Sequence, residues 1–118
     1  MLKLLLIKQD AVVHEYALNE GTTSIGRGAN NDIRLADISV SSNHAQINVT
    51  PNEYLRFIND IVLTDLQSTN GTRINGQTVK IQKLNNGDEI QVGRVTFRLD
   101  VEQQEDVDST RIYLPESN

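Results

Sequence analysis

The sequence predicts an all-β fold: an antiparallel β-sandwich of about eleven short strands, followed by a polar, acidic C-terminal tail. Two observations lead to this prediction. Apolar and polar residues alternate over short runs, and clusters of Gly, Asn, Asp and Pro separate these runs. An α/β fold would need amphipathic helical stretches of ten or more residues, and we find none.

The clearest alternation lies at 95–101, with four apolar residues on one face and three polar residues on the other. Residues 45–49 and 89–92 repeat the pattern. The apolar run from Leu4 to Ile7 is too short for a signal peptide or a membrane span, so it predicts a buried first strand at 2–8. The other predicted strands are 12–17, 22–26, 33–35, 55–58, 61–65, 72–75 and 78–81.

Length and turn chemistry predict a single folded unit. The chain has 118 residues and a mass of 13.2 kDa, which is about one domain. Asn75-Gly76, between two apolar-alternating segments, is typical of a two-residue hairpin turn. We predict a sandwich domain at 1–101 and an acidic tail at 102–118.

Composition and charge narrow the possible functions. The absence of Cys fits a reducing compartment, so we expect a cytoplasmic protein. The net charge is −5, and five acids against one base lie in the tail, so the body is nearly neutral. With no basic surplus and five aromatic residues, the sequence argues against nucleic-acid binding, and no segment points to a membrane.

Catalysis finds little support in the sequence. His14 and His44 are the two imidazoles, and no Gly-x-Ser-x-Gly nucleophile motif accompanies the local serine–histidine pair. The carboxylates are scattered over loops without the spacing of a metal site or an acid–base pair. We therefore predict no enzyme activity, no metal and no cofactor.

Three predicted loops, at 26–32, 37–44 and 65–72, are rich in small polar donors. They combine one arginine, Arg27, with hydroxyls, side-chain amides and glycines. A forked guanidinium with hydroxyl and amide donors suits a dianionic phosphate on a peptide. On composition alone, ordinary turns are the better explanation of these loops.

The order and spacing of short motifs favour the phosphate interpretation, because together they resemble the forkhead-associated (FHA) domain over roughly residues 2–101. The motifs are Gly26-Arg27, Asn31-Asp32-Ile33, Val40-Ser41-x-x-His44, Asp65-Leu66-x-Ser68-Thr69-Asn70-Gly71-Thr72, Asn75-Gly76 and Leu84-x-x-Gly87-Asp88-x-Ile90-x-x-Gly93.

The resemblance implies an eleven-stranded β-sandwich that binds phosphothreonine peptides through loops at one end. It implies that Arg27 grips the phosphate, that Ser41 supplies a hydroxyl, and that His44 supports the loop. It further implies that Thr69 lies near the phosphate and that Asn70 hydrogen-bonds the peptide backbone. Scaffold positions of the family match Gly26, Gly71, Asn75 and Gly76.

One position departs from the family pattern. Ser42 follows the phosphate-binding serine, where the family often has Arg or Asn. A short neutral hydroxyl there can still donate to a phosphate, and we expect the affinity to be lower.

The sequence therefore predicts a phosphothreonine-dependent interaction module of signalling, whose partners are substrates of a serine/threonine kinase. A non-phospho assembly domain that uses another face of the sandwich is the alternative. The tail contains Thr110, preceded by acids and followed by a short apolar stretch. We predict that Thr110 is a phosphoacceptor that fills the Arg27 site of a second copy. The plainer alternatives are a disordered end, or a short strand that docks through Ile112 and Leu114.

Overall fold

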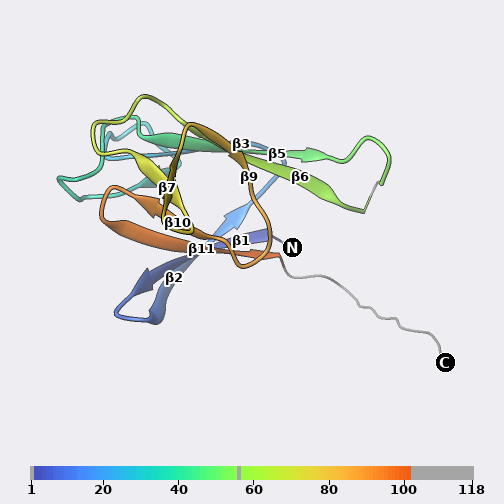
Figure 1. Ribbon diagram of the computed structural model, residues 1–118, viewed down its shortest axis with the longest axis horizontal. Coiled ribbons are helices and arrows are strands. Elements are labelled where there is room, and N and C mark those ends of the chain that lie inside the picture. Colours follow the sequence, from blue (N-terminus) through green and yellow to red (C-terminus); the bar gives the residue numbers. More distant parts are fainter. Residues whose placement is uncertain (1, 56, 102–118) are drawn as a thin grey trace.

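Eleven β-strands form two packed sheets in the computed structural model, which describes residues 2–55 and 57–101 (Figure 1). The strands are β1 (Leu2–Lys8), β2 (Ala11–Leu18), β3 (Gly21–Gly26), β4 (Ile33–Arg34), β5 (Ala45–Pro51), β6 (Asn59–Asp65), β7 (Thr72–Ile74), β8 (Gln77–Val79), β9 (Ile81–Lys83), β10 (Glu89–Val92) and β11 (Val95–Val101). No helix occurs in these residues. The all-β prediction is confirmed; the tail at 102–118 lies outside the described residues.

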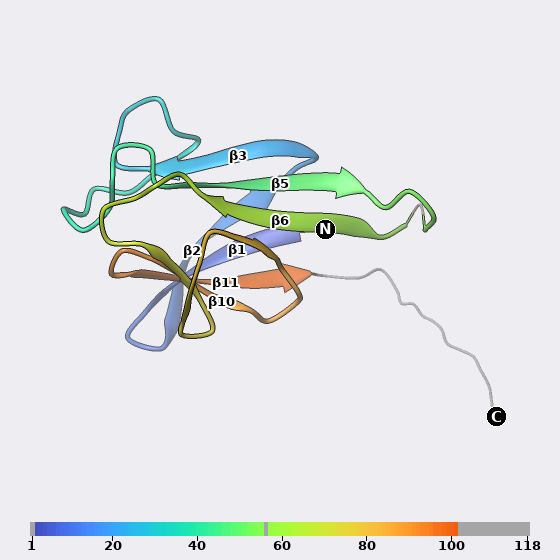
Figure 2. The same cartoon turned by 45° about the horizontal axis from the view of Figure 1, so that its top comes forward.

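The two sheets have different strand orders and face each other as two layers (Figure 2). The six-stranded sheet runs β2-β1-β11-β10-β7-β8, and the five-stranded sheet runs β4-β3-β5-β6-β9. Most of the recorded pairings are antiparallel, whereas β3 and β4 pair in parallel. The two layers leave loops at both ends of the sandwich.

The predicted alternation places the core between the sheets. In β11, Phe97 and Leu99 are buried while Arg98 is exposed, and Ile47 in β5 and Leu63 in β6 meet them from the facing sheet at 0% exposure. Leu4 of β1 is also fully buried, which confirms the buried first strand. This rigid core holds the loops at each end in fixed positions.

Two strand predictions were wrong. Leu55, Phe57 and Ile58 lie outside any strand. The Asn52 side-chain oxygen accepts hydrogen bonds from the backbone N–H groups of Tyr54 and Leu55, at 2.9 Å each. These bonds to nearby N–H groups compete with a strand ladder.

The predicted strand 78–81 is two strands, β8 and β9, which belong to different sheets. The chain crosses between them at Lys80, whose carbonyl accepts a hydrogen bond from the Asp65 N–H at 2.7 Å. The sequence T-V-K-I-Q at 78–82 alternates without interruption, so the crossing leaves no mark on the pattern.

The Asn75-Gly76 hairpin is confirmed. Both residues have positive φ angles, +51° and +87°, and Ile74 pairs with Gln77 across the turn. This is the two-residue turn whose twist matches the flanking strands. The Asn75 side chain also bonds Asp88 and the Glu89 N–H, so the hairpin is tied to the start of β10.

Candidate functional site

The three polar loops predicted from the sequence meet at one end of the sandwich (Figure 1). They connect β3 to β4, β4 to β5 and β6 to β7. We call the surface they form the three-loop surface: residues 27–32, 35–44 and 66–71. The β10–β11 turn, at Gly93 and Arg94, packs beside it, with the Arg94 N–H 2.9 Å from the Ser39 hydroxyl oxygen.

Arg27 is exposed on this surface and anchored by its neighbours. Its backbone N–H donates to the Ser41 carbonyl at 2.9 Å, and its side-chain Nε donates to the Val40 carbonyl, also at 2.9 Å. Among the described residues, nothing bonds its two terminal guanidinium nitrogens. The backbone thus orients the guanidinium and leaves its forked end for an anion.

Gly26 lets the first two loops come this close. A Cβ at Gly26 would collide with the Ser42 carbonyl oxygen and would lie 2.7 Å from the Asn31 amide nitrogen. Gly28 N–H and the Asn31 side chain both donate to that same carbonyl, at 3.1 and 2.6 Å. Ser42 is therefore held through its backbone, while its side chain is exposed and has no hydrogen-bond partner in the described chain.

Ser41 joins the second loop to the third. Its hydroxyl oxygen accepts a hydrogen bond from the Thr69 N–H at 3.0 Å. A hydroxyl carries one donor hydrogen, and this contact does not use it. The Ser41 hydrogen therefore remains available to a ligand beside the exposed side chain of Thr69.

His44 is fully buried and bridges the same two loops. The Ser41 N–H donates to Nδ1 at 3.0 Å, and Nε2 lies 2.8 Å from the Gly71 carbonyl oxygen. A backbone N–H can only donate and a carbonyl can only accept, so the imidazole proton sits on Nε2. His44 faces away from solvent, where it supports the loops.

Asn70 is exposed and linked to the second loop. Its side-chain nitrogen donates to the Ser39 carbonyl at 2.9 Å, which leaves its amide oxygen unused.

The Ser39 hydroxyl in turn donates to Asp37 at 2.6 Å and accepts from the Arg94 N–H. The Ser39 hydroxyl and the Ser39 backbone N–H both donate to the Asp37 carboxylate. These two bonds, together with the Arg94 side chain 3.6 Å away, hold the pKa of the Asp37 carboxyl below its usual 3.8.

Asp65, at the end of β6, stabilises the third loop through its carboxylate. Its carboxylate accepts hydrogen bonds from the hydroxyls of Ser68, at 2.6 Å, and Thr72, at 2.7 Å, and from the Ser68 N–H. Partial burial raises the pKa of this carboxyl, but the bonds from Ser68 and Thr72 outweigh it and hold the pKa below 3.8. Gly71, with a φ of +85°, follows and donates to the Ser68 hydroxyl.

The structure thus brings together eight of the ten predicted site residues: Gly26, Arg27, Ser41, Ser42, His44, Thr69, Asn70 and Gly71. Asn75 and Gly76 lie at the far end of β7 and reach the loops only through that strand. Thr110, the predicted phosphoacceptor, lies outside the described residues.

Comparison with known proteins identifies the type of domain. The sequence model of the FHA domain family matches residues 23–93, which span most of the sandwich and all three loops. The chain belongs to the FHA domain family. Solved members of this family are studied for phosphothreonine-dependent interactions, so the prediction of a phosphothreonine-dependent interaction domain is confirmed at the level of the family.

Individual relatives agree with this assignment. The chain is 37% identical over 97 residues to the glycogen accumulation regulator GarA of Mycobacterium tuberculosis. The aligned region covers 80% of this chain and 56% of GarA. The chain therefore spans about half the length of the curated relatives it matches.

Two solved FHA structures superpose closely on the chain. One, studied for its phosphothreonine-dependent interactions, has a TM-score of 0.73 at 32% identity and covers 86% of this chain and 97% of its own. The FHA domain of FhaA, complexed with the intracellular domain of Rv3910, has a TM-score of 0.70 at 33% identity and covers 84% and 99%.

Sequence reasoning missed several residues that shape this FHA surface, namely Asn31, Asp37, Ser39, Asp65 and Ser68. Asp65 and Ser68 bond within their own loop, whereas Asn31 bonds the Ser42 carbonyl of the next loop and the Arg94 N–H bonds the Ser39 hydroxyl across 55 residues. Asn31, Asp65 and Ser68 stood inside the quoted motifs, so the motif spacing was the available signal. Nothing in the sequence around Asp37 and Ser39 marked their role.

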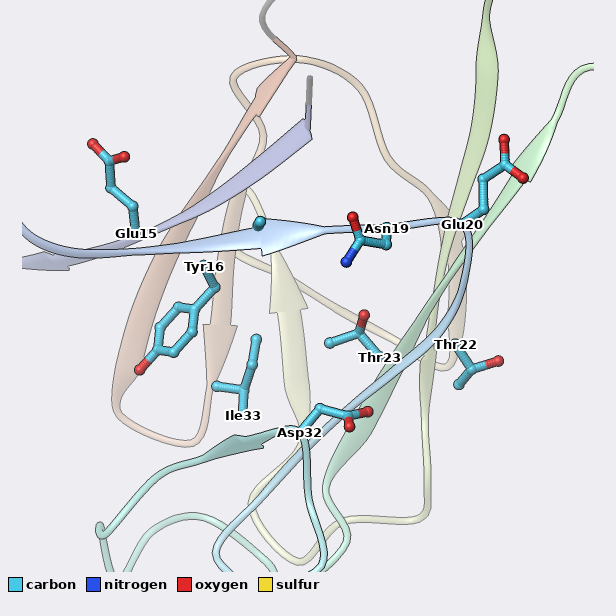
Figure 3. A pocket seen from close by; sticks show the side chains of 9 residues that line it. Glu15, Tyr16, Asn19, Glu20, Thr22, Thr23, Asp32 and Ile33 are labelled. Atoms are coloured by element: carbon cyan, nitrogen blue, oxygen red, sulfur yellow. The ribbon is translucent and has the colours of Figure 1, made fainter.

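A separate pocket of about 410 Å³ lies along β2 and β3 (Figure 3). Three carboxylates line it, from Glu15, Glu20 and Asp32, and they approach from different sides without converging. Asp32 is already bonded to the Ser24 N–H at 2.9 Å. A phosphate would be repelled here, so this pocket does not compete with the three-loop surface.

Residues 2–55 and 57–101 contain no group of three or more His, Cys, Asp or Glu side chains arranged to hold a metal ion. In the same residues there is no helix with the length and apolar character to cross a membrane.

Proposed function

We propose that this FHA domain binds phosphothreonine peptides on the three-loop surface, with Arg27 as the main phosphate anchor. Ser41, Ser42 and Thr69 add phosphate donors, and Asn70 holds the peptide backbone. The observation that carries the proposal is the pose of Arg27. The carbonyl of Val40 fixes the Arg27 Nε and leaves the terminal nitrogens unbonded within the described residues, and the next residue, Ser41, keeps its hydroxyl hydrogen for a ligand.

The energetics suit a reversible signalling contact. Phosphothreonine carries about −1.5 to −2 charges near neutral pH. Each charge-assisted hydrogen bond contributes on the order of 1.5–3 kcal/mol. Three or four of them, reduced by ordering costs, correspond to about −8 kcal/mol, or roughly micromolar affinity. The loops are already cross-linked by His44, Ser41 and Asn70, which limits the ordering cost.

The partners in this proposal are phosphorylated substrates of a serine/threonine kinase. The FHA domain of FhaA, a structural neighbour of this chain, is complexed with the intracellular domain of another protein, which supports a protein as the partner. We place the protein in the cytoplasm, since a chain without cysteine suits a reducing compartment. We further propose a sandwich domain at 1–101 and a tail at 102–118 whose phosphorylated Thr110 binds the Arg27 site of a second copy.

Calorimetric titration of the full chain with a degenerate phosphothreonine peptide library tests the proposal. We expect binding of phosphothreonine peptides, no binding of the unphosphorylated peptides, and about fourfold weaker binding of phosphoserine peptides that lack one buried methyl. Arg27→Ala should remove most of the binding.

The matched control is Arg98→Ala, which removes the same charge from an exposed position on β11. It should bind like the unmodified protein. Equal affinity for phosphorylated and unphosphorylated peptides would favour the alternative, a non-phospho assembly domain acting through another face.

A further inference from the structure

A groove of about 770 Å³ opens at the end of the sandwich opposite the three-loop surface. Its lining residues come from the ends of β1, β2, β5, β6, β9 and β11, together with the turn after β2 and the loops before β6 and before β10. These strand ends and loops lie on the side of the sandwich away from the three loops (Figure 1). The apolar part of the lining comprises Leu2, Leu18, Val49, Phe57, Ile61 and Leu84, with Val101 at its edge. The volume lies within the usual range for binding pockets in proteins.

The loop before β6, at the rim of this groove, carries large apolar side chains that are exposed to solvent. Phe57 is 86% exposed, and Leu55 and Ile58 beside it are 46% and 39% exposed. All three line the groove. A gathering of large apolar side chains at the mouth of a groove is typical of a surface that binds something.

The described chain ends in the wall of this groove. Val101 is a lining residue, and its N–H donates to the Asn86 side-chain oxygen at 2.8 Å, which fixes the exit of β11 against the rim. Eleven residues later the sequence reads Ile112-Tyr113-Leu114, an apolar stretch in an otherwise polar tail. A flexible chain of eleven residues has an end-to-end distance of about 17–20 Å, so this stretch stays near the groove.

We propose that the groove binds the tail segment Ile112–Leu114 of the same chain. In an extended backbone, Ile112 and Leu114 point to one side and Tyr113 to the other, so the first two would enter the groove. The tether gives the segment an effective concentration in about the millimolar range, so even a weak apolar contact becomes occupied.

Charge favours this occupant. The charged residues that line the groove are Glu20, Asp60 and Lys83, a net charge of −1, and the Lys83 ammonium lies 3.4 Å from the Asp60 carboxylate. The segment 110–114 carries a single charge, that of Arg111. The Arg111 cation next to Ile112 therefore complements the acidic lining.

Paramagnetic broadening of amide NMR signals in the full chain tests the proposal. The absence of native cysteine allows a single nitroxide at Ser117→Cys. We expect strong loss of signal at the groove residues Asn59, Lys83 and Asn85, and none at Ala29 and Asn43 on the three-loop surface. Uniform broadening, or none at the groove, overturns the proposal.

Two matched pairs of variants sharpen the test. Ile112→Ser with Leu114→Ser should abolish the broadening, whereas Tyr113→Ser should retain it. On the groove side, Phe57→Ser should weaken it, whereas Tyr54→Ser should not. Tyr54 is equally exposed, at 86%, on the same loop, but does not line the groove. Because both residues are so exposed, neither change should unfold the domain.

A mixed sample separates binding within one chain from binding between chains. Isotope-labelled protein without nitroxide is combined with unlabelled protein that carries it. We expect no broadening at the groove in this mixture. Broadening there would mean that a second copy fills the groove, and would contradict binding within the chain.

Discussion

The hydroxyl oxygen of Ser41 accepts a hydrogen bond from the backbone N–H of Thr69 at 3.0 Å. This contact fixes two loops that lie 28 residues apart and leaves the Ser41 hydrogen for a ligand. Ser41 thus combines a structural role with a proposed binding role, whereas the neighbouring Ser42 side chain has no partner in the described residues. The pair allows the two roles to be separated by experiment.

Ser41→Ala should lower both stability and phosphopeptide affinity. Loss of the bond from Thr69 should reduce the free energy of unfolding by about 0.5–1.5 kcal/mol, and loss of a donor to the phosphate should weaken binding about tenfold or more. Ser42→Ala should leave stability unchanged and weaken binding less. Urea denaturation and calorimetry measure the two effects; an unchanged affinity in Ser41→Ala would exclude this hydroxyl from the site.

Arg27→Lys should bind phosphopeptide nearly as poorly as Arg27→Ala. A lysine retains the charge but has neither the Nε donor to the Val40 carbonyl nor the forked end that grips two oxygens. Both variants keep the backbone bond to Ser41, so their melting temperatures should stay close to that of the unmodified protein. Full affinity in the lysine variant would mean that charge alone suffices.

His44→Ala should reduce the free energy of unfolding by at least about 2 kcal/mol and weaken binding as a consequence. The change leaves the Ser41 N–H and the Gly71 carbonyl without their partner in a buried site. Thermal and chemical denaturation measure the loss. Weaker binding with unchanged stability would instead identify His44 as a direct ligand contact.

The sequence predicted the sandwich well because its longer strands alternate clearly, as in β5 and β11, where the buried residues are those expected. It failed where local hydrogen bonding or a crossing between the sheets overrides the pattern. The Asn52 side chain bonds the N–H groups of Tyr54 and Leu55 where the strand 55–58 was predicted, and the crossing at Lys80 splits 78–81 between two sheets. Neither event alters the apolar pattern.

For the site, the order of the motifs predicted which loops meet, but not which hydrogen bonds connect them. The ties between loops run from side chains to distant backbone groups, as from Asn70 to the Ser39 carbonyl and from Asn31 to the Ser42 carbonyl. A backbone carbonyl has no signature in the sequence. The roles of Asp37 and Ser39 therefore became visible only in the folded chain.

The carboxylate of Asp65 should contribute stability that depends on pH. Its pKa is lower in the folded chain than the usual 3.8, because hydrogen bonds from Ser68 and Thr72 outweigh its burial. Its contribution is therefore complete above the unfolded pKa and is lost as the pH falls below about 3.8 through the folded value. Asp65→Asn should cost about 1–3 kcal/mol at pH 7, and this difference should shrink under acid conditions.

Urea denaturation of both proteins at pH 7 and at pH 3 measures the Asp65 contribution. Asp88→Asn is a suitable control, since Asp88 also bonds backbone and side-chain groups but lies in the turn before β10, away from the three loops. Only Asp65→Asn should also weaken phosphopeptide binding at pH 7. A stability difference that does not change with pH would contradict the assigned role of this carboxylate.

Phosphorylation of Thr110 should produce association between chains. Val101 leaves the sandwich beside Asn86, whereas the other end of β11 meets the three-loop surface through Arg94 and Ser39. The nine residues from Val101 to Thr110 span at most about 30 Å, and β11 itself measures about 20 Å. Reaching its own Arg27 would thus require an almost straight tail, and a tail held in the groove at Ile112 could not reach it.

A second copy can accept the phosphate without this constraint, and a head-to-tail contact of this kind builds chains or closed rings. Sedimentation of protein phosphorylated at Thr110 should reveal an oligomer that grows with concentration. The same protein with Arg27→Ala should sediment as a monomer, because the phosphate then has no anchor, and Arg98→Ala should associate normally. A phosphorylated protein that stays monomeric at all concentrations would rule out self-association through this tail.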